Sequence, residues 1–395
     1  MTNHKKNRTI PAFTPSKRAD IDPFIVMDVM QAAHEREVAG RHVIHMEVGQ
    51  PGTAAPMGAQ IAARDAMASG PMGYSLALGV PELRAGIAQK YDEWYGVSLN
   101  PERVVITTGS SAAFTYAFLS AFDAGDRLAL PAPGYPCYRH ISKALGLTPV
   151  SIETNAAGRW MPTIEDIDRA HRQAPLGGLL LASPANPTGT MISNDRLKEL
   201  ATYCSENAIW FISDEIYHGL TYDGRAHSAL EHSNDVIVIN SFSKYFSMTG
   251  WRVGWMVVPP QLVRPIERLA QNLYIAPPTI SQMAALGALE ATEELEQNKE
   301  AYAKNRELLL SELPKAGFDK LLPADGAFYI YADVSALTDD SATFARTMLD
   351  ETGVATTPGH DFDAENGHRF LRFSYSRSHA DMVEAMERLK AWRMS

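Results

Sequence analysis

The residues best suited to chemistry lie in the segment Ser-Phe-Ser-Lys-Tyr-Phe-Ser-Met-Thr-Gly-Trp-Arg-Val-Gly, which spans residues 241–254. The apolar run 236–239 before it predicts a buried strand, so Lys244 should leave the strand end into a loop, where reactive residues are often placed. A lone lysine is usually a solvated surface charge. Here two serines precede it, and the guanidinium of Arg252, eight positions later, suits a phosphate. One lysine for an imine and one arginine for a dianion would suit pyridoxal phosphate.

The pattern Ser-x-Ser-Lys followed by Gly-x-Arg-x-Gly resembles the cofactor-lysine signature of the class I and II aminotransferases, which are fold-type I enzymes that use pyridoxal phosphate. The resemblance covers nearly the whole chain, from Gly49 to Arg372, with the motifs in the family's order. It implies that Lys244 carries the cofactor imine and that Ser241 and Arg252 contact the phosphate.

A carboxylate follows another predicted strand, the apolar run 208–213. A cofactor that acts as an electron sink needs a protonated ring nitrogen, and an ion-paired carboxylate keeps it so. Asp214 fits that role. A strand-end Asp-Glu could instead bind magnesium, but no phosphate-loop motif accompanies it. The resemblance implies that Tyr217 and Asn186, the latter in Asn-Pro-Thr-Gly, hydrogen-bond the 3′ oxygen of the cofactor, and Asn186 is also expected beside the substrate.

A second anion-binding feature is expected where the apolar strand 104–108 gives way to Gly109-Ser110-Ser111 and an uncharged helix. A helix start presents free backbone N–H groups, and the helix dipole favours an anion there. Ser110 and Ser111 could simply cap the helix, which is compatible with the same role. The resemblance implies that the cofactor phosphate binds at this turn.

Three further residues are assigned by the resemblance. Tyr135, in Pro-Gly-Tyr-Pro, matches the position whose aromatic ring covers the cofactor's pyridine ring. Tyr74, in Gly-Tyr-x-x-x-x-Gly, matches a tyrosine that crosses a dimer interface to the neighbour's cofactor phosphate, so it predicts a homodimer. Gly49 matches a glycine beside the substrate carboxylate, although as structure it is simply a turn residue.

An arginine near the end of the chain is expected to bind the substrate α-carboxylate. The segment Leu-Arg-Phe-Ser at 371–374 resembles the family's segment in which an arginine grips that carboxylate through two hydrogen bonds. This assigns Arg372, with Arg369 as the competitor. The two arginines are an odd number of positions apart on a predicted strand and therefore point to opposite faces, and Arg369 better fits a solvent-exposed edge.

Strands and helices alternate from about residue 100 to 260, which predicts an α/β domain with a mostly parallel sheet. The ends of its strands carry Asn186, Asp214 and Lys244, where ligands of such sheets bind. Helices are predicted at residues 22–40, 81–95, 260–272, 281–313 and 378–394, and further strands at 43–48, 127–130, 177–183, 326–331 and 369–376.

The chain of 395 residues is long enough for two domains. We expect an aspartate-aminotransferase-like fold. Its large cofactor-binding domain, with the sheet flanked by helices, would span residues 50–290, and a smaller α/β domain would be built from both chain ends, 1–49 and 291–395.

The charge distribution disfavours nucleic acid as a partner, and the cysteine content disfavours a disulfide framework or a zinc site. The formal net charge of -10 comes from 46 acidic against 36 basic residues without a long run of one sign, which disfavours nucleic acid. The two cysteines, Cys137 and Cys204, are not spaced for a disulfide framework or a zinc site. Residues 1–20 look like a loose arm without an apolar centre, and no run of 18 apolar residues occurs, so we expect a cytoplasmic protein without membrane contact.

The resemblance implies transamination by double displacement. An amino acid replaces Lys244 on the cofactor, Arg372 orients its carboxylate, and the freed lysine moves the α-proton, so that a 2-oxo acid is released and a second one is aminated. A lyase that acts by β-elimination at the same carbon, or other chemistry at that carbon, is the alternative, since the cofactor and not the fold determines the reaction. A regulator that uses the module as a sensor is a third hypothesis.

The side chain of the substrate is the least determined property. In one subgroup of aspartate-specific relatives, a basic residue on the helix after the phosphate turn meets the second carboxylate, but residues 112–123 contain no lysine or arginine. The loops 10–25 and 274–280, which we expect beside the substrate, look apolar. A neutral or aromatic amino acid is therefore expected.

Overall fold

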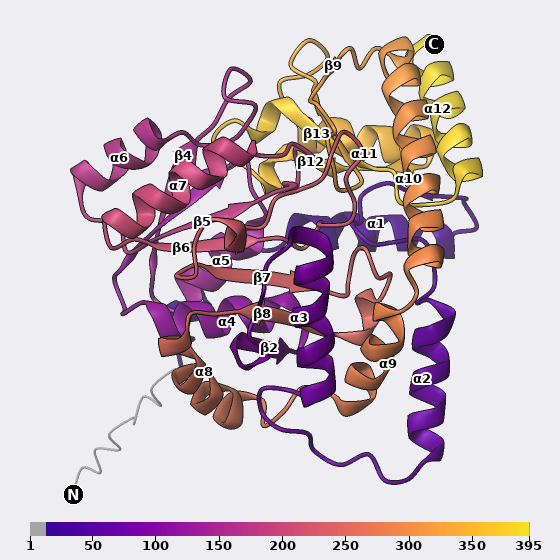
Figure 1. The fold of residues 1–395 in the computed structure, drawn as a ribbon. Coiled ribbons are helices and arrows are strands. Elements are labelled where there is room, and N and C mark those ends of the chain that lie inside the picture. Colours follow the sequence, from indigo (N-terminus) through magenta and orange to yellow (C-terminus); the bar gives the residue numbers. More distant parts are fainter. Residues whose placement is uncertain (1–12, 395) are drawn as a thin grey trace, which may run out of the picture.

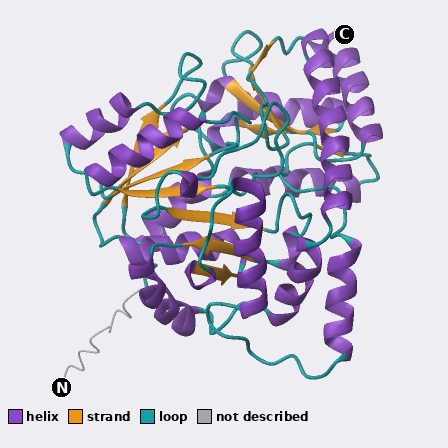
Figure 2. Cartoon of the chain, in the orientation of Figure 1, coloured by secondary structure: helices purple, strands orange, loops and turns teal. Residues whose placement is uncertain are grey.

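The computed structural model describes residues 13–394, and it is α/β with a central sheet flanked by helices (Figures 1 and 2). The sheet has seven strands in the order β2-β8-β7-β6-β5-β3-β4. Its strands are β2 (Val104–Thr107), β3 (Arg127–Ala132), β4 (Thr148–Glu153), β5 (Gly178–Ala182), β6 (Trp210–Asp214), β7 (Ile237–Ser241) and β8 (Gly254–Val257). β8 is antiparallel to its two neighbours, and the other pairs are parallel. The predicted fold class is confirmed.

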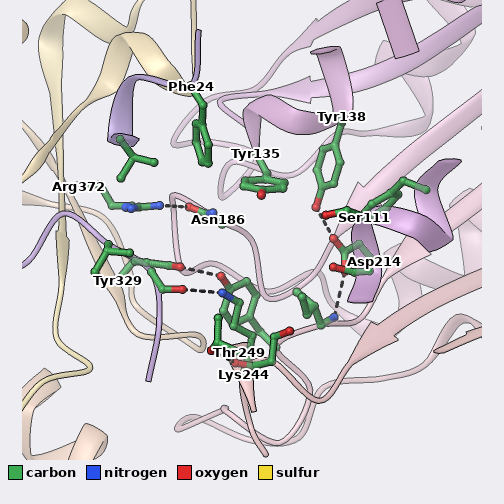
Figure 3. Close-up of a pocket in the computed structure, with 18 of the residues that line it drawn as sticks. Phe24, Ser111, Tyr135, Tyr138, Asn186, Asp214, Lys244, Thr249, Tyr329 and Arg372 are labelled. Carbon is green, nitrogen blue, oxygen red and sulfur yellow. Dashed lines mark hydrogen bonds between the residues drawn. The ribbon is translucent and has the colours of Figure 1, made fainter. Parts of the chain in front are cut away.

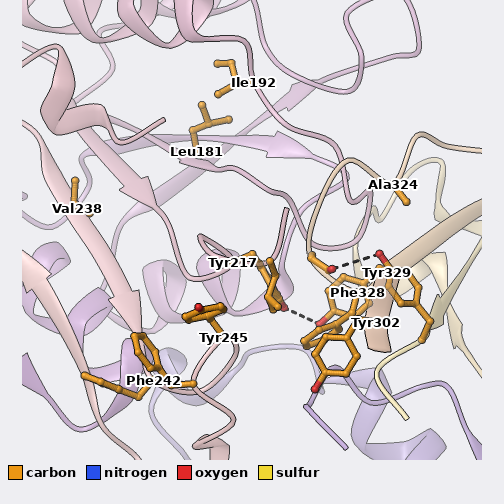
Figure 4. Packing of buried hydrophobic residues seen from close by; sticks show 14 of the residues in the cluster. Leu181, Ile192, Tyr217, Val238, Phe242, Tyr245, Tyr302, Ala324, Phe328 and Tyr329 are labelled. Carbon is orange, nitrogen blue, oxygen red and sulfur yellow. Dashed lines mark hydrogen bonds between the residues drawn. The ribbon is translucent and has the colours of Figure 1, made fainter. Parts of the chain in front are cut away.

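Helices cover both faces of this sheet, which is why its central strands are continuous apolar runs. Alternate side chains of one strand enter different cores: Leu180 of β5 packs in one cluster, while Leu179 and Leu181 pack in the other. The second of these cores continues into the small unit described below, where Tyr302 and Phe328 join it (Figure 4). The helices are α2 (Met57–Ala68), α3 (Pro81–Tyr95), α4 (Gly109–Ala121), α5 (Pro136–Ala144), α6 (Ile164–Gln173), α7 (Asn194–Glu206), α8 (Pro260–Leu273) and α9 (Thr279–Leu289).

Segments from both chain ends form a smaller unit beside this sheet (Figure 1). β1 (Ile44–His45) pairs in parallel with β11 (Val354–Ala355). A four-stranded sheet has the order β12-β13-β10-β9. Its strands are β9 (Lys320–Leu321), β10 (Tyr329–Asp333), β12 (Thr357–Pro358) and β13 (Phe370–Ser374), and the helices of the unit are α1 (Ile25–Val38), α10 (Thr292–Glu312), α11 (Ser341–Thr352) and α12 (His379–Met394). The domain limits 1–49, 50–290 and 291–395 stay a prediction, and residues 1–12 of the expected arm lie outside the described residues.

Some predicted elements differ from the structure. The single helix expected at 281–313 is two helices, because α9 packs against α2 through a close contact of Gly58 and Gly287, whereas α10 crosses to the small unit and packs against α12. The strand expected at 43–48 pairs at only two residues. Among residues 13–394, no helix has the length and apolar character needed to cross a membrane.

Candidate active site

A cavity of about 210 Å³ lies where the carboxyl ends of the central strands meet the small unit (Figure 3). Its position follows from the topology, because the loops that leave parallel strands on one edge of a sheet bring their side chains together. Ten of the twelve predicted site residues line it: Gly49, Ser110, Ser111, Tyr135, Asn186, Asp214, Tyr217, Lys244, Arg252 and Arg372. The structure does not bring Ser241 or Tyr74 to the cavity wall.

Lys244 lies three residues after β7 and projects into this cavity. Its Nζ donates a hydrogen bond to the carbonyl oxygen of Gly49 at 2.5 Å. Removal from water, together with the nearby positive charges of Arg372 and Arg252, lowers the pKa of Lys244 to about 8, although the charge of Asp214 opposes this shift. A lysine with such a pKa is neutral often enough near physiological pH to act as a nucleophile and as a base.

Asp214, the last residue of β6, is buried with 2% of its surface exposed. One carboxylate oxygen accepts a short hydrogen bond from the Tyr138 hydroxyl, and the other accepts the backbone N–H of Ile216 at 3.1 Å. Burial raises the pKa of Asp214 to about 6, against the opposing effects of these hydrogen bonds and of the Lys244 charge. A buried carboxylate of this kind is stabilised by a cation placed against it. Tyr138 was not predicted from the sequence.

The opposite part of the cavity is suited to an anion. α4 begins at Gly109, and its capping position Thr108 makes no side-chain hydrogen bond to the helix, so backbone N–H groups near Ser110 and Ser111 have no side-chain cap. Gly109 has φ of +72°, and a Cβ there would lie 2.4 Å from Nη2 of Arg252. The arginine is therefore packed directly on this turn, where both its charge and the helix dipole favour an anion.

Ser241 has a structural role in this conformation. Its hydroxyl donates to the carbonyl oxygen of Val253 at 3.0 Å and lies 2.8 Å from the hydroxyl of Ser243. The second serine of the Ser-x-Ser-Lys motif, Ser243, lines the cavity instead. Ser241 is the last residue of the buried strand β7, whereas Ser243 lies in the turn that follows it, beside Lys244.

Arg372, on β13, is buried with 3% of its surface exposed. Its Nη1 donates to Oδ1 of Asn186 at 2.8 Å, and Nη2 donates to the Glu47 carbonyl and to Oγ1 of Thr357. Its Nε has no hydrogen-bond partner among the described residues, which leaves a buried N–H donor that a ligand could satisfy.

The guanidinium of Arg372 lies between two aromatic rings, with its central carbon 4.4 Å from the centre of the Tyr329 ring and 4.8 Å from that of Phe362. The competing Arg369 is 45% exposed at its side chain and pairs with Asp333 at 3.1 Å. This is the solvent-exposed position that the strand alternation predicted.

Tyr329 of β10 is a second cavity residue that the sequence did not reveal. Its hydroxyl lies 2.7 Å from that of Tyr217. A Cβ on Gly49 would lie 1.9 Å from the Tyr329 hydroxyl, so a glycine is required where the β1 segment passes this ring. Tyr329 follows Gly326 in a segment that was predicted as a strand, but only the pairing of β10 with β13 shows that it faces Arg372.

The start of α1 supplies an apolar wall to the cavity, through Phe24, Val26, Met27 and Met30. The ring of Phe24 meets that of Tyr135 edge to face at 5.9 Å between centroids (Figure 3). Among the described residues that line the cavity, the cationic side chains are Lys244, Arg252 and Arg372.

Comparison with known proteins agrees with this geometry. Residues 41–389 match the family described as aminotransferase class I and II. The chain belongs to this family. It is 47% identical over 379 residues to the valine–pyruvate aminotransferase of Mycobacterium tuberculosis, with 95% of this chain and 97% of that protein covered. It is 33% identical to the aspartate/prephenate aminotransferase of Thermus thermophilus, over 93% of this chain and 95% of that protein.

Solved structures give the same result for the fold. The crystal structure of an aminotransferase from Mycobacterium tuberculosis superposes with a TM-score of 0.94 at 46% identity, covering 96% of this chain and 99% of that one. The protein is therefore an aminotransferase, a transferase that acts on amino groups, and the resemblance noted in the sequence is confirmed. The family uses pyridoxal phosphate.

Proposed function

We propose that this aminotransferase binds pyridoxal 5′-phosphate in the cavity, with Lys244 as the cofactor lysine, and uses it to move the amino group of an apolar amino acid to a 2-oxo acid. The observation that carries the proposal is the convergence on one cavity of Lys244, buried Asp214 and the uncapped start of α4. Each of these features has a partner in the chemistry of this cofactor.

The residues present fit the cofactor at each of its functional groups. The phosphate would be held by Ser110, Ser111 and Arg252, where N–H groups, hydroxyls and a guanidinium are combined. The carboxylate of Asp214 would meet the ring nitrogen and keep it protonated, which also provides the cation that this buried carboxylate otherwise lacks. Tyr135, Tyr217 and Asn186 line the wall between these ends and would contact the ring and its 3′ oxygen.

The roles of the protein residues follow from their positions. When bound, the cofactor supplies an electron sink and a carbon that receives the amino group. Arg372 would hold the substrate α-carboxylate through two N–H donors, with the Nε hydrogen now partnered. Lys244, whose pKa is lowered to about 8 by its surroundings, would take the proton from the substrate α-carbon and return it at a second carbon.

The apolar wall of the cavity is evidence that the substrate has an apolar side chain. Phe24, Val26, Met27 and Met30 present apolar surface, and each cation that lines the cavity already has a role above, so one subunit offers no cation for a second substrate carboxylate among the residues described. The relative named valine–pyruvate aminotransferase is also more similar, at 47% identity, than the relative named aspartate/prephenate aminotransferase, at 33%. We infer valine-like donors and pyruvate-like acceptors.

A homodimer is part of the proposal. Tyr74 is 84% exposed in one subunit, and the segments around it are joined, because Thr279 donates to the carbonyl of Gly73 and Gln282 donates to Ser75. Exposed apolar residues lie on these and adjoining elements: Met57, Ile61, Met67, Met72, Leu76, Leu119, Leu273, Tyr274 and Ile275. A surface of this kind supports burial against a second subunit, which would bring Tyr74 to the partner's phosphate site.

The test is an absorbance spectrum of the protein with pyridoxal phosphate, recorded as valine, alanine or aspartate is added without a 2-oxo acid. The expected result is replacement of the aldehyde-form band by the amine-form band, at lower concentrations of valine than of aspartate. Subsequent addition of pyruvate should restore the first spectrum, with alanine as the product.

Other outcomes would contradict defined parts of the proposal. Release of ammonia with an unchanged spectrum would favour elimination over transfer. A response to aspartate at lower concentrations than to valine would overturn the substrate class but leave the cofactor site intact. A protein without the cofactor band would overturn the role of Lys244.

A further inference from the structure

The N-terminal end of α1, which carries the apolar wall, has no capping side chain of its own. The residue at the capping position is Phe24, which has no side-chain hydrogen-bond acceptor. The first N–H groups of a helix need acceptors, and inside a protein they cannot rely on water. Their acceptor here comes from a residue more than 330 positions later in the chain.

That residue is Asp361, which is 2% exposed and ends the short turn Gly359–Asp361. Its Oδ1 accepts the N–H of Ile25 at 3.1 Å, and its Oδ2 accepts the N–H of Val26 at 3.3 Å. A carboxylate at a helix start is also favoured by the helix dipole. The two oxygens of one side chain therefore replace the missing local cap.

Asp361 is the main polar anchor of this wall. Apart from the hydrogen bonds within α1 and within the turn before it, residues 13–30 make two hydrogen bonds to the rest of the described chain, and Asp361 accepts both. The other polar contact is an ion pair of Asp22 with Lys143 at 3.9 Å between exposed side chains, which contributes little. The preceding residues 13–23 are exposed and do not anchor the helix.

The short segment that carries Asp361 also touches two other walls of the active site. Thr357, four residues earlier, accepts a hydrogen bond from Arg372 at 3.3 Å. Phe362, the next residue, stacks on the same guanidinium, and its carbonyl accepts the N–H of Gly134 at 3.0 Å, next to Tyr135. The segment 357–362 thus connects the carboxylate-binding arginine, the ring-covering tyrosine and the apolar wall.

We propose that Asp361 is a positioning residue for substrate specificity: it holds the start of α1 over the cavity, so that Phe24, Val26 and Met27 contact the side chain of an apolar amino acid. It does not touch the cavity itself and takes no part in proton transfer. This inference rests on the proposed substrate class, and it predicts an effect on substrate binding that depends on the size of the substrate side chain.

The test compares Asp361→Ala and Asp361→Asn with the wild-type holoenzyme, using valine and alanine as donors and, as the common acceptor, a 2-oxo acid that is the product of neither donor. In Asp361→Ala, KM for valine should rise about tenfold, a change typical of one lost helix cap, while kcat stays within about twofold. KM for alanine should rise less, because a methyl group has little surface to place against the wall. Asparagine retains one acceptor oxygen and should restore part of the loss.

Asp340 provides a matched control. It caps α11 by accepting the N–H groups of Ala342 and Thr343, and α11 packs against the Gly359–Asp361 turn but supplies no residue to the cavity. Asp340→Ala should lower stability to a similar degree and leave KM for valine unchanged. Equal rises of KM in Asp340→Ala and Asp361→Ala would overturn the positioning role, as would an unchanged KM in a folded Asp361→Ala.

Two arrangements keep the result decisive. If Asp361→Ala does not fold, Asp361→Asn alone must raise KM for valine with kcat retained, and an unchanged KM overturns the inference. Amide hydrogen exchange of residues 25–38 should be faster in either variant whichever amino acid the enzyme prefers. Failure of the proposed substrate class would appear in the wild type as a preference for aspartate, whereas failure of this inference would appear as unaltered exchange in α1.

Discussion

At the scale of single residues, the site is defined by groups whose pKa values are shifted by the cavity around them. Desolvation and two arginines lower the pKa of Lys244 to about 8, and burial raises the pKa of Asp214, at the end of the neighbouring strand, to about 6. Both shifts disfavour charge in a site without a ligand. Both are therefore consistent with a site built for a charged cofactor.

Lys244→Ala should abolish transamination while leaving the fold intact. The variant lacks the amine that bonds the cofactor and moves the proton, so the rate of conversion of valine should fall by at least about 10³-fold. Stopped-flow absorbance of the half-reaction measures this rate, and circular dichroism checks the fold. Retention of full activity by the variant would mean that another residue is the cofactor lysine.

The lowered pKa of Lys244 also predicts a pH dependence of stability in the cofactor-free protein. The group has a pKa of 10.5 when unfolded and about 8 when folded, so the unfolded chain binds more protons between these values and wild-type stability rises with pH across that window. Below pH 8 the folded protein carries the full free-energy cost of keeping this buried lysine protonated. Lys244→Met should therefore be more stable than wild type by up to about 3 kcal/mol below pH 8, with the difference disappearing near pH 10.5.

Thermal unfolding of the cofactor-free variants at a series of pH values measures this difference. The control is Lys198→Met, which replaces an exposed lysine on α7. A constant difference between Lys244→Met and wild type from pH 7 to pH 10.5 would show that the lysine is not desolvated in solution.

At the scale of elements, the turn between β2 and α4 determines how an anion can approach. Gly109 allows Arg252 to pack directly on the start of the helix. The guanidinium and the first N–H groups of the helix therefore lie at the same region of the cavity. The proposed phosphate site is thus a property of the contact between two loops, and not of either motif alone.

Gly109→Ala should weaken binding of pyridoxal phosphate by about 10- to 100-fold, because the new Cβ would displace the Arg252 guanidinium and lose charge-assisted hydrogen bonds. Gly96→Ala is the matched control. Gly96 has a similar positive φ of +68°, but a Cβ there meets nothing within 4 Å, so this variant carries the backbone strain alone. Fluorescence titration gives both affinities, and equal losses would exclude a specific role of the turn.

Local patterns predicted the residues that follow strands, and they failed for residues that depend on distant packing. Lys244, Asp214 and Asn186 each follow an apolar run, and all three line the cavity. Tyr138 and Asp361 were missed. Tyr138 lies one helical turn after Tyr135 on a helix that was not predicted, and the role of Asp361 exists only through a contact with residues 336 positions away.

For Ser241 and for the helix expected at 281–313, the sequence pattern predicted the element but not the contacts that it makes. The motif identified the loop correctly, but Ser241 is the last residue of β7 and bonds the Val253 carbonyl, and Ser243 in the following turn lines the cavity instead. The charged residues after Glu290 continued the helical pattern, whereas the change of packing partner from α2 to α12 separates α9 from α10. Propensity carries no information about which neighbour an element will meet.

At the scale of the whole molecule, the large unit supplies the residues proposed to bind the cofactor, and the small unit supplies Arg372 and the apolar wall. The exposed apolar surface around Tyr74 belongs to neither cavity nor core of one subunit. We therefore expect the functional unit to contain two copies of the chain.

Sedimentation should give a mass of two chains at micromolar concentrations. Tyr74→Phe removes one hydroxyl donor to the partner's phosphate site and should raise the dissociation constant of pyridoxal phosphate by about tenfold, with the dimer retained. Tyr203→Phe, which removes a hydroxyl on α7 that bonds Asp168, should have no effect on this affinity. A monomer with full activity would contradict the proposed assembly.

The parallel pairing of β1 with β11 has a consequence for how the protein is made. Ile44 meets Val354, so the early strand has no partner until more than 300 further residues have left the ribosome. Contacts between residues so far apart in the sequence form slowly, because the chain must lose the entropy of closing a long loop before the contact stabilises it. The large sheet can assemble during synthesis, but Arg372 and the contact of Asp361 with the start of α1 must wait for the end of translation. With the roles proposed for these residues, substrate binding is the last property that the growing chain acquires.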